Sequence, residues 1–163
     1  MTEAILAIIL IAGGIGLDRW VKSWCVRVLQ PAGSIPLWEG VFHLTYAENQ
    51  GAAFSMLHGA RWLLIAVTGV VLLVLIIALC AGKIPRGLAR WGVYCVIAGA
   101  VGNLIDRIAQ GYVVDLFDFR LIHFAVFNVA DVFVCTGGGL IALWAILSMI
   151  REGREGRAEG KKP

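Results

Sequence analysis

The chain divides into long apolar blocks separated by shorter polar segments. A helix needs roughly 20 apolar residues to cross the hydrocarbon core of a bilayer, and each block is close to that length. The pattern therefore predicts four transmembrane helices, at about residues 4–24, 62–81, 88–107 and 124–150.

The segments between these helices follow other patterns. From Val41 to Tyr46, β-branched and aromatic residues alternate loosely with other residues and glycines flank the run, which favours short strands within the outer segment 26–61. The second outer segment contains "GYVVDLFDF", and we expect a short loop or helix there. Residues 151–163 are expected to form a solvated cytoplasmic tail. Residues 1–163 are thus predicted to be a single polytopic membrane domain, an all-α integral membrane protein with a small extracytoplasmic β platform.

Composition and charge agree with this prediction. Of the 163 residues, 60% are hydrophobic and 15% charged, whereas about a quarter are charged in typical soluble domains. The formal net charge of +3 gives no reason to expect nucleic-acid binding. The first block starts with Glu3 and has no Lys or Arg before its apolar run, so we interpret it as a retained helix and not as a cleaved signal peptide.

The basic residues indicate an orientation. Cytoplasmic loops are enriched in Lys and Arg, and the short loop between the second and third blocks carries Lys83, Arg86 and Arg90. The tail is also basic, with Arg151, Arg154, Arg157, Lys161 and Lys162. Four spans place this loop and both termini on the same side, which we expect to be the cytoplasm.

No clustered metal ligands are visible in the sequence. The cysteines Cys25, Cys80, Cys95 and Cys135 have no CxxC spacing, and a reduced cysteine in an apolar run behaves as a small hydrophobic residue. The histidines are isolated and do not form an HExxH motif. We therefore expect no metal site and no cofactor.

Polar residues gather at one membrane boundary. The uncharged run from Val132 to Ile150 covers roughly 28 Å as a helix, which is about one hydrocarbon core. Asp131 therefore lies at the outer edge of the bilayer. The same layer is predicted to hold the outer ends of the first and third helices and parts of both outer segments, and so to contain Asp18, Lys22, Asn49, Asn103, Asp106, Arg107, Asp115 and Asn128.

Asp115 and Asp131 differ from the other acids in this layer. Neither has a basic residue three or four positions away, whereas Asp18 precedes Lys22 by four positions, the favoured order for a helical ion pair. Two carboxylates at one depth can share a proton, as in aspartic proteases. The alternative is that they only brace helices. For Asp18, Arg19 and Lys22 we favour snorkelling helix-end charges with local salt bridges, and for Asp106 with Arg107 a structural pair that braces the site.

Four ordered motifs resemble those of the lipoprotein signal peptidases, also called signal peptidase II. They are "AENQGAAFS" at 47–55, "AGAVGNLIDR" at 98–107, "GYVVDLFDF" at 111–119 and "FNVADVFV" at 127–134. The resemblance covers most of the chain and implies a bacterial inner-membrane aspartyl endopeptidase with its site near the outer face. It implies cleavage of diacylglyceryl-modified prolipoproteins before the lipidated cysteine, and inhibition by the cyclic peptide globomycin.

The resemblance also assigns roles to residues. Asp115 and Asp131 match the catalytic aspartates, and Asn49, Asn103, Arg107 and Asn128 match polar residues that line the family's site. Asp18 matches an acid of the first helix, and we expect Lys22 and Asp106 to support the site as well. Two positions depart from the usual pattern, Ala98 in the second motif and Val132 in the fourth. Neither departure alters a carboxylate.

Two other functions stay open at this point. Intramembrane acids often mark ion paths, so a small transporter or proton-conducting protein is the main alternative, although no inverted repeat is visible. A non-catalytic membrane scaffold is the other. Membrane lipid is a necessary partner in each case, and we expect a monomer.

Overall fold

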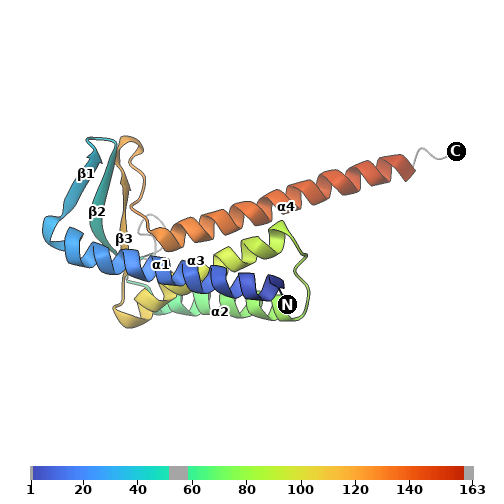
Figure 1. Ribbon diagram of the computed structural model, residues 1–163, viewed down its shortest axis with the longest axis horizontal. Helices are drawn as coiled ribbons and strands as arrows, with labels where there is room; N and C mark the ends of the chain where they lie inside the picture. Colours follow the sequence, from blue (N-terminus) through green and yellow to red (C-terminus); the bar gives the residue numbers. More distant parts are fainter. Residues whose placement is uncertain (1, 52–58, 160–163) are drawn as a thin grey trace.

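A computed structural model describes residues 2–51 and 59–159, and this part of the chain contains four long helices and a small sheet (Figure 1). The elements in order are α1 (Thr2–Ala32), β1 (Ser34–Trp38), β2 (Phe42–Asn49), α2 (Arg61–Cys80), α3 (Leu88–Ala109), β3 (Val113–Phe119), the short 3-10 helix η2 (Arg120–Ile122) and α4 (Val129–Glu159). The sheet lies at one end of the helices. The predicted architecture, four helices with a small β platform, is confirmed.

All four helices are long and apolar enough to cross a membrane. Mean hydropathy is highest in α2, at 3.2, and lowest in α3, at 1.4. Large apolar side chains of α2 such as Val70 and Leu73 are exposed. A soluble monomer rarely exposes a continuous apolar surface of this kind, whereas lipid covers it in a bilayer. The chain is a multi-pass membrane protein.

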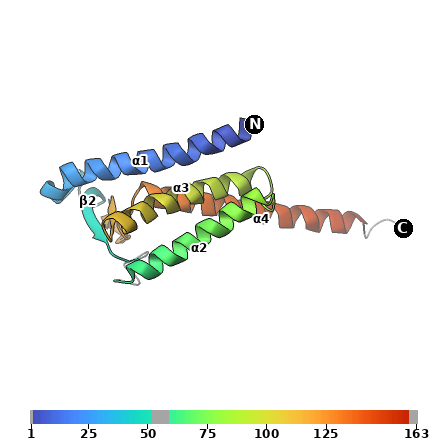
Figure 2. The same ribbon diagram turned by 90° about the horizontal axis from the view of Figure 1, so that it is seen from below.

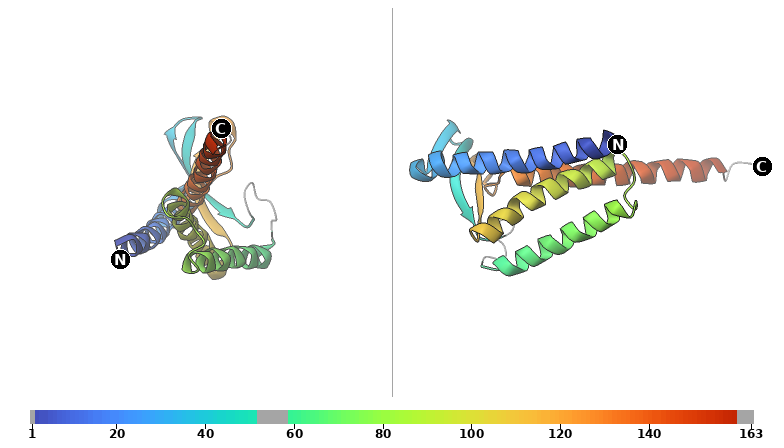
Figure 3. Two further views of the ribbon diagram at one scale, coloured as in Figure 1. Left: turned by 90° about the vertical axis from the view of Figure 1, so that its right-hand side faces the viewer. Right: turned by 60° about the horizontal axis from the view of Figure 1, so that its bottom comes forward.

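Helix α3 occupies the centre of the bundle. It packs against α1, α2 and α4, and the end-on view shows the other three helices arranged around it (Figure 3). Half of the residues in the most apolar stretch of α3 are buried inside the protein, whereas only 6% are buried in the corresponding stretch of α2. The lower hydropathy of α3 follows from this position, because a central helix can carry polar residues that face its neighbours instead of lipid.

Glycines bring α3 close to α4. A Cβ atom on Gly99 would lie 2.2 Å from the Ala130 carbonyl oxygen, and one on Gly137 would lie 2.5 Å from the Gly92 carbonyl oxygen. Small residues permit such an approach between membrane helices. The neighbouring Gly138 and Gly139 do not take part in this contact, because a Cβ at either position would meet no atom within 4 Å.

The helix ends differ from those predicted. Helix α1 continues to Ala32, because Cys25 and Leu29 of its last turns are buried against Val114 and Leu116 of the sheet. Helix α4 begins at Val129 and not near residue 124. The chain before it is extended, since the Phe127 carbonyl accepts N–H donors from Leu116 and Phe117. At its other end α4 runs on to Glu159, so most of the predicted tail is helical.

The sheet is antiparallel with strand order β1-β2-β3. The strand predicted from Val41 to Tyr46 corresponds to β2. The second outer segment contains the short helix that we expected, η2, but most of it is the strand β3, which pairs with β2 along its length. Ala47 lies opposite Asp115, and Asn49 lies opposite Val113. Figure 2 shows the α1 N-terminus and the α2–α3 connection together at the end of the bundle remote from the sheet.

Candidate active site

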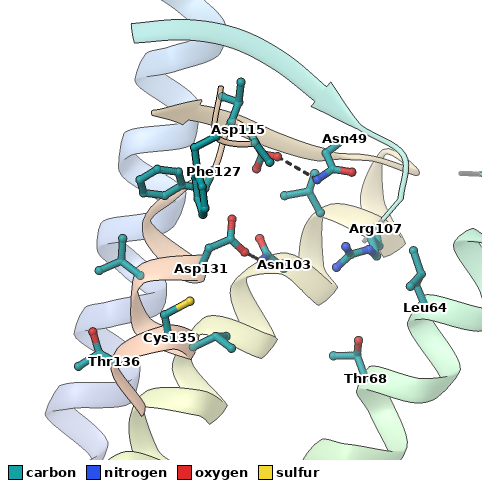
Figure 4. Close-up of a pocket in the computed structure, with 16 residues that line it drawn as sticks. Asn49, Leu64, Thr68, Asn103, Arg107, Asp115, Phe127, Asp131, Cys135 and Thr136 are labelled. Carbon is teal, nitrogen blue, oxygen red and sulfur yellow. Dashed lines mark hydrogen bonds between the residues drawn. The ribbon is translucent and has the colours of Figure 1, made fainter. Parts of the chain in front are cut away.

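Asp115 and Asp131 line one cavity of about 540 Å³ where the sheet meets the helices. Asp115 comes from the middle of β3 and Asp131 from the first turn of α4. Figure 4 shows both carboxylates pointing into the same space, with Asn49, Asn103 and Arg107 around it. The sequence placed these residues in one layer, and the fold brings them to one site.

A reciprocal cap at the start of α4 positions Asp131. The Asn128 side-chain oxygen accepts the Asp131 backbone N–H at 2.9 Å, and Asp131 Oδ2 accepts the Asn128 backbone N–H at 3.0 Å. This is a capping box with Asn and Asp in place of Ser and Glu. The other oxygen, Oδ1, accepts an N–H from the Asn103 amide at 2.8 Å. Both oxygens of Asp131 are thus held by N–H groups.

Two amides hold Asp115 in the same way. Asn128 Nδ2 donates to Asp115 Oδ1 at 2.6 Å, and Asn49 Nδ2 donates to Oδ2 at 3.0 Å. Asn49 reaches this position because β2 pairs with β3 and ends beside Asp115. Asn128 therefore contacts both aspartates. Its side-chain NH₂ group donates to Asp115, whereas its side-chain oxygen and its backbone N–H bond to Asp131.

Burial raises the pKa of Asp115 to about 7. The negative charge of Asp131 adds to this effect, while the amides of Asn49 and Asn128 and the charge of Lys22 oppose it. A carboxyl group with a pKa near neutrality can hold a proton that a catalytic step uses. The influence of Asp131 on Asp115 is the coupling expected of two acids that share a site.

Behind the aspartates lies a buried ion cluster. Lys22 Nζ is 2.9 Å from Asp18 Oδ2 and 2.8 Å from Asp106 Oδ2, and Arg19 also pairs with Asp106. The side chain of Lys22 is only 2% exposed. The hypothesis of snorkelling is wrong for Asp18 and Lys22, because α3 covers them and supplies Asp106 as a second partner of Lys22. The local salt bridge that we expected between Asp18 and Lys22 is present.

Arg107 does not pair with Asp106 as a local brace. It lines the cavity, and its Nη2 donates to the Gly51 carbonyl at 2.9 Å, which holds the chain that follows β2. Arg61, at the start of α2, donates in turn to the Arg107 and Ile108 carbonyls at 2.8 Å each. Asp106 instead faces α1 and the Lys22 cluster.

Comparison with known proteins identifies the chain. The family model described as signal peptidase (SPase) II matches residues 7–147. A lipoprotein signal peptidase from Synechocystis sp. is 47% identical over 139 residues, which are 81% of each chain. One from Clostridioides difficile is 43% identical over 142 residues, covering 87% of this chain and 93% of the relative. The chain belongs to the signal peptidase II family.

Solved structures agree on the fold. The structure of a bacterial membrane enzyme, determined in meso at 1.9 Å resolution, matches with a TM-score of 0.76 at 25% sequence identity. The match covers 86% of this chain and 92% of the enzyme's chain. A second, at 2.3 Å resolution, has a TM-score of 0.77 and covers 96% of this chain. As a signal peptidase II, the chain is a membrane endopeptidase of the aspartic class, which favours that function over the transporter and the scaffold.

Sequence reasoning missed part of the signal peptidase II cavity. Its walls include Leu64 and Thr68 from α2, Phe124 and Phe127 from the chain before α4, and Cys135 and Thr136 one turn beyond Asp131. Thr68 could have been noticed as a lone hydroxyl in an apolar block. The other wall residues are apolar or small, and nothing in the sequence distinguishes them from residues that face lipid.

Expectations from sequence also concern the cysteines and the possible metal ligands of this signal peptidase II. All four cysteines are free. Within residues 2–51 and 59–159, no three His, Cys, Asp or Glu side chains cluster closely enough to hold a metal ion. That hydrolysis needs no metal stays a prediction.

Proposed function

We propose that this chain removes signal peptides from diacylglyceryl-modified prolipoproteins, with Asp115 and Asp131 as the catalytic pair. Cleavage takes place before the lipidated cysteine, at the outer face of the inner membrane. The family of the chain and the name of its relatives, lipoprotein signal peptidase, support this substrate class.

One observation carries the assignment of the pair. Asp115 and Asp131 line the same cavity, and every side-chain amide that contacts either carboxylate within residues 2–51 and 59–159 presents an N–H group to it. Carboxylates needed only to brace helices would be expected to pair with the basic residues nearby. Lys22 and Arg19 pair instead with Asp18 and Asp106, which leaves the two cavity aspartates available for chemistry.

The proposed reaction is a hydrolysis through a shared proton. The ionised carboxylate accepts a proton from water, and the water oxygen bonds to the scissile carbonyl carbon. The protonated carboxyl donates to the carbonyl oxygen. Collapse of the tetrahedral intermediate breaks the C–N bond. The proton taken from water passes to the leaving amine, and the hydroxyl that received the other proton returns it to the second carboxylate, so that the pair again holds a single proton. The products are the signal peptide, with a new carboxyl terminus, and the lipidated cysteine, with a free amino group.

The cavity is suited to a lipid-anchored substrate. Its polar lining includes the aspartates, Asn103 and Arg107, and its apolar walls include Leu64, Val132 and Val134. The acyl chains of the modified cysteine hold the neighbouring peptide bond at the membrane surface, so a protease for that bond needs its carboxylates at the same level. We infer that the signal helix and the acyl chains of the substrate pack against the apolar walls of the cavity.

The basic loops support an orientation for the protein. Arg86 and Arg90 lie near Glu3, with Nε–Oε2 and Nη1–Oε1 distances of 3.9 and 3.5 Å, at the end of the bundle remote from the sheet. Positive residues favour the cytoplasmic side. We infer that both termini are cytoplasmic, that the aspartates face outward, and that the enzyme acts as a monomer without nucleic acid.

Cleavage of a purified diacylglyceryl prolipoprotein in detergent tests this function. We expect Asp115→Asn and Asp131→Asn each to lose nearly all turnover, since a positioned acid or base contributes about 10²–10⁴-fold. The double variant should be little worse than either single one, because the two residues act as a unit. Substrate binding should persist in all three variants.

Asp118→Asn is the matched control. Asp118 lies on the same strand as Asp115, but its carboxylate accepts from Thr45 and Arg120 and does not line the cavity. This variant should turn over substrate like the wild type. If Asp131→Asn kept most of its turnover, Asp131 would be a structural acid and the proposed pair would be wrong.

A further inference from the structure

The three asparagines at the aspartates have fixed amide orientations. An asparagine amide has a carbonyl end that only accepts and an NH₂ end that only donates. Asn49 Oδ1 accepts the Gly51 backbone N–H at 2.9 Å, which directs Nδ2 to Asp115. Asn128 Oδ1 accepts the Asp131 backbone N–H, which also directs its Nδ2 to Asp115. Local backbone geometry orients both of these amides.

Asn103 has no such backbone anchor among the hydrogen bonds of the described residues. Its Oδ1 accepts from Lys22 Nζ at 2.8 Å, and its Nδ2 donates to Asp131 Oδ1 at 2.8 Å. Asn128 Nδ2 also donates to Asn103 Oδ1, at a longer 3.1 Å. The anchor is therefore a buried ammonium on another helix, 81 residues away in the chain.

Three buried oxygens lie within 2.9 Å of Lys22 Nζ, two as ion-pair partners and one as a hydrogen-bond acceptor. Two are carboxylate oxygens of Asp18 and Asp106, and the third is the neutral oxygen of Asn103. An ammonium has no acceptor, so a rotated Asn103 would place its NH₂ against Lys22 and its oxygen against Asp131. Both contacts would be repulsive in a buried site. Lys22 and Asp131 thus enforce one orientation from opposite ends of the amide.

We propose that Lys22 is a positioning residue for the catalytic pair, because its ammonium fixes the Asn103 amide so that an N–H always faces Asp131. This role rests on the proposed function and extends it to a residue outside the cavity walls. Lys22 acts through Asn103 and does not contact substrate. Its loss should therefore lower kcat and leave KM unchanged.

The size of the effect follows from the remaining contacts. Without Lys22, Asn103 Oδ1 keeps only the longer bond from Asn128, and the amide can rotate away from Asp131. Outer-shell partners that orient a functional ligand are typically worth about 10–100-fold. We expect kcat of Lys22→Met to fall by about that factor.

A double-mutant cycle tests the inference. Lys22→Met, Asn103→Ala and the double variant are compared by single-turnover cleavage of the same lipidated substrate, with binding measured separately. We expect Lys22→Met to slow cleavage in the wild-type background and to cause no further loss once Asn103 is Ala. A purely structural Lys22 would slow cleavage by the same factor in both backgrounds, and that result would overturn the inference.

A charge-balanced variant serves as the control for defects in folding. Lys22→Met leaves Asp106 paired with Arg19 but removes the cation that pairs with the buried Asp18, which can prevent folding. The cycle is therefore repeated in an Asp18→Asn background, where one buried charge of each sign is removed. Thermal unfolding is measured for every variant, so that loss of stability is separated from loss of turnover.

Arg19→Gln provides the matched control. Arg19 pairs with the same Asp106 but does not contact Asn103, so its loss should lower thermal stability and leave kcat unchanged. Wild-type kcat in Lys22→Met would also overturn the inference. If the wild-type enzyme itself failed to cleave lipidated substrate, the proposed function would fail, whereas active wild type with an additive cycle would refute only the role of Lys22.

Discussion

At the scale of single residues, each aspartate is held by groups that only donate. Asp115 lies on a strand and takes its donors from two side-chain amides, whereas Asp131 caps a helix and takes one donor from the backbone and one from Asn103. Burial and the negative charge of Asp131 favour a proton on Asp115, while the amides of Asn49 and Asn128 favour its ionised form. The balance of these effects suits a pair that carries a single proton.

This balance predicts a bell-shaped dependence of kcat/KM on pH. The rising limb reports loss of the first proton from the pair, and the falling limb reports loss of the second. Since the pKa of Asp115 is raised to about 7, activity should fall as pH rises through about 7, when both carboxyl groups become ionised. Initial rates with a lipidated substrate, measured from acid to alkaline pH, check this.

Asp118→Asn serves as a control here as well. Asp118 lies on the same strand, and although its partial burial acts to raise its pKa, hydrogen bonds from Arg120 and Thr45 lower it overall. Its replacement should leave the profile unchanged. A wild-type rate that stayed constant up to pH 9 would show that no shared proton is needed.

At the scale of elements, the contact between α3 and α4 sets the distance between Asn103 and Asp131. Gly99 lies one turn before Asn103 and faces the Ala130 carbonyl, next to Asp131. The amide of Asn103 can bridge the two helices only because their backbones approach closely at this point. The geometry of the proposed site therefore depends on the absence of a side chain at Gly99 as much as on the polar residues.

Gly99→Ala should therefore damage both stability and activity. Its Cβ would lie 2.2 Å from a backbone oxygen that has little freedom to move, and overpacking of this kind typically costs about 1–3 kcal/mol. Separation of the helices should lengthen the bond from Asn103 to Asp131 and lower kcat. Thermal unfolding and cleavage rates measure the two effects.

Gly138→Ala is the matched substitution, because a Cβ there meets no atom within 4 Å. It should leave both quantities close to those of the wild type. Equal behaviour of the two variants would mean that the helices can separate at Gly99 without consequence.

At the scale of the whole molecule, the sheet and the basic α2–α3 connection lie at opposite ends of the bundle (Figures 1 and 2). The cavity with the aspartates lies at the sheet end. If the basic connection is cytoplasmic, the site necessarily faces the outer side, where a lipid-modified substrate would present its cleavage site.

Reporter fusions test this topology. A reporter after Pro163 should behave as cytoplasmic, and one inserted at Gly59 as external, because an even number of spans returns the chain to its starting side. A reporter between α2 and α3, at Lys83, should match the one after Pro163. The reverse pattern at any of these sites would contradict the orientation.

The sequence by itself determined the membrane-spanning helices and indicated the polar residues of the proposed site. Hydropathy is a local property, and the bilayer imposes one length on every span, so four helices could be predicted to within a few residues at most ends. The predicted position of Asp131 at the edge of the bilayer follows from the same comparison of helix length with bilayer thickness. The motifs then indicated Asp115 and Asp131 as a pair, because their order along the chain is itself sequence information.

Only the tertiary structure decided which groups meet. Sequence spacing reveals neighbours within one helix, so Lys22 could be paired with Asp18 but not with Asp106 and Asn103 of α3. The strand β3 forms because β2 supplies partners for its backbone, and α4 starts late because Phe127 is bonded to that strand. Long-range contacts such as these fixed the amide orientations and made one site from residues that lie up to 113 positions apart, from Asp18 to Asp131.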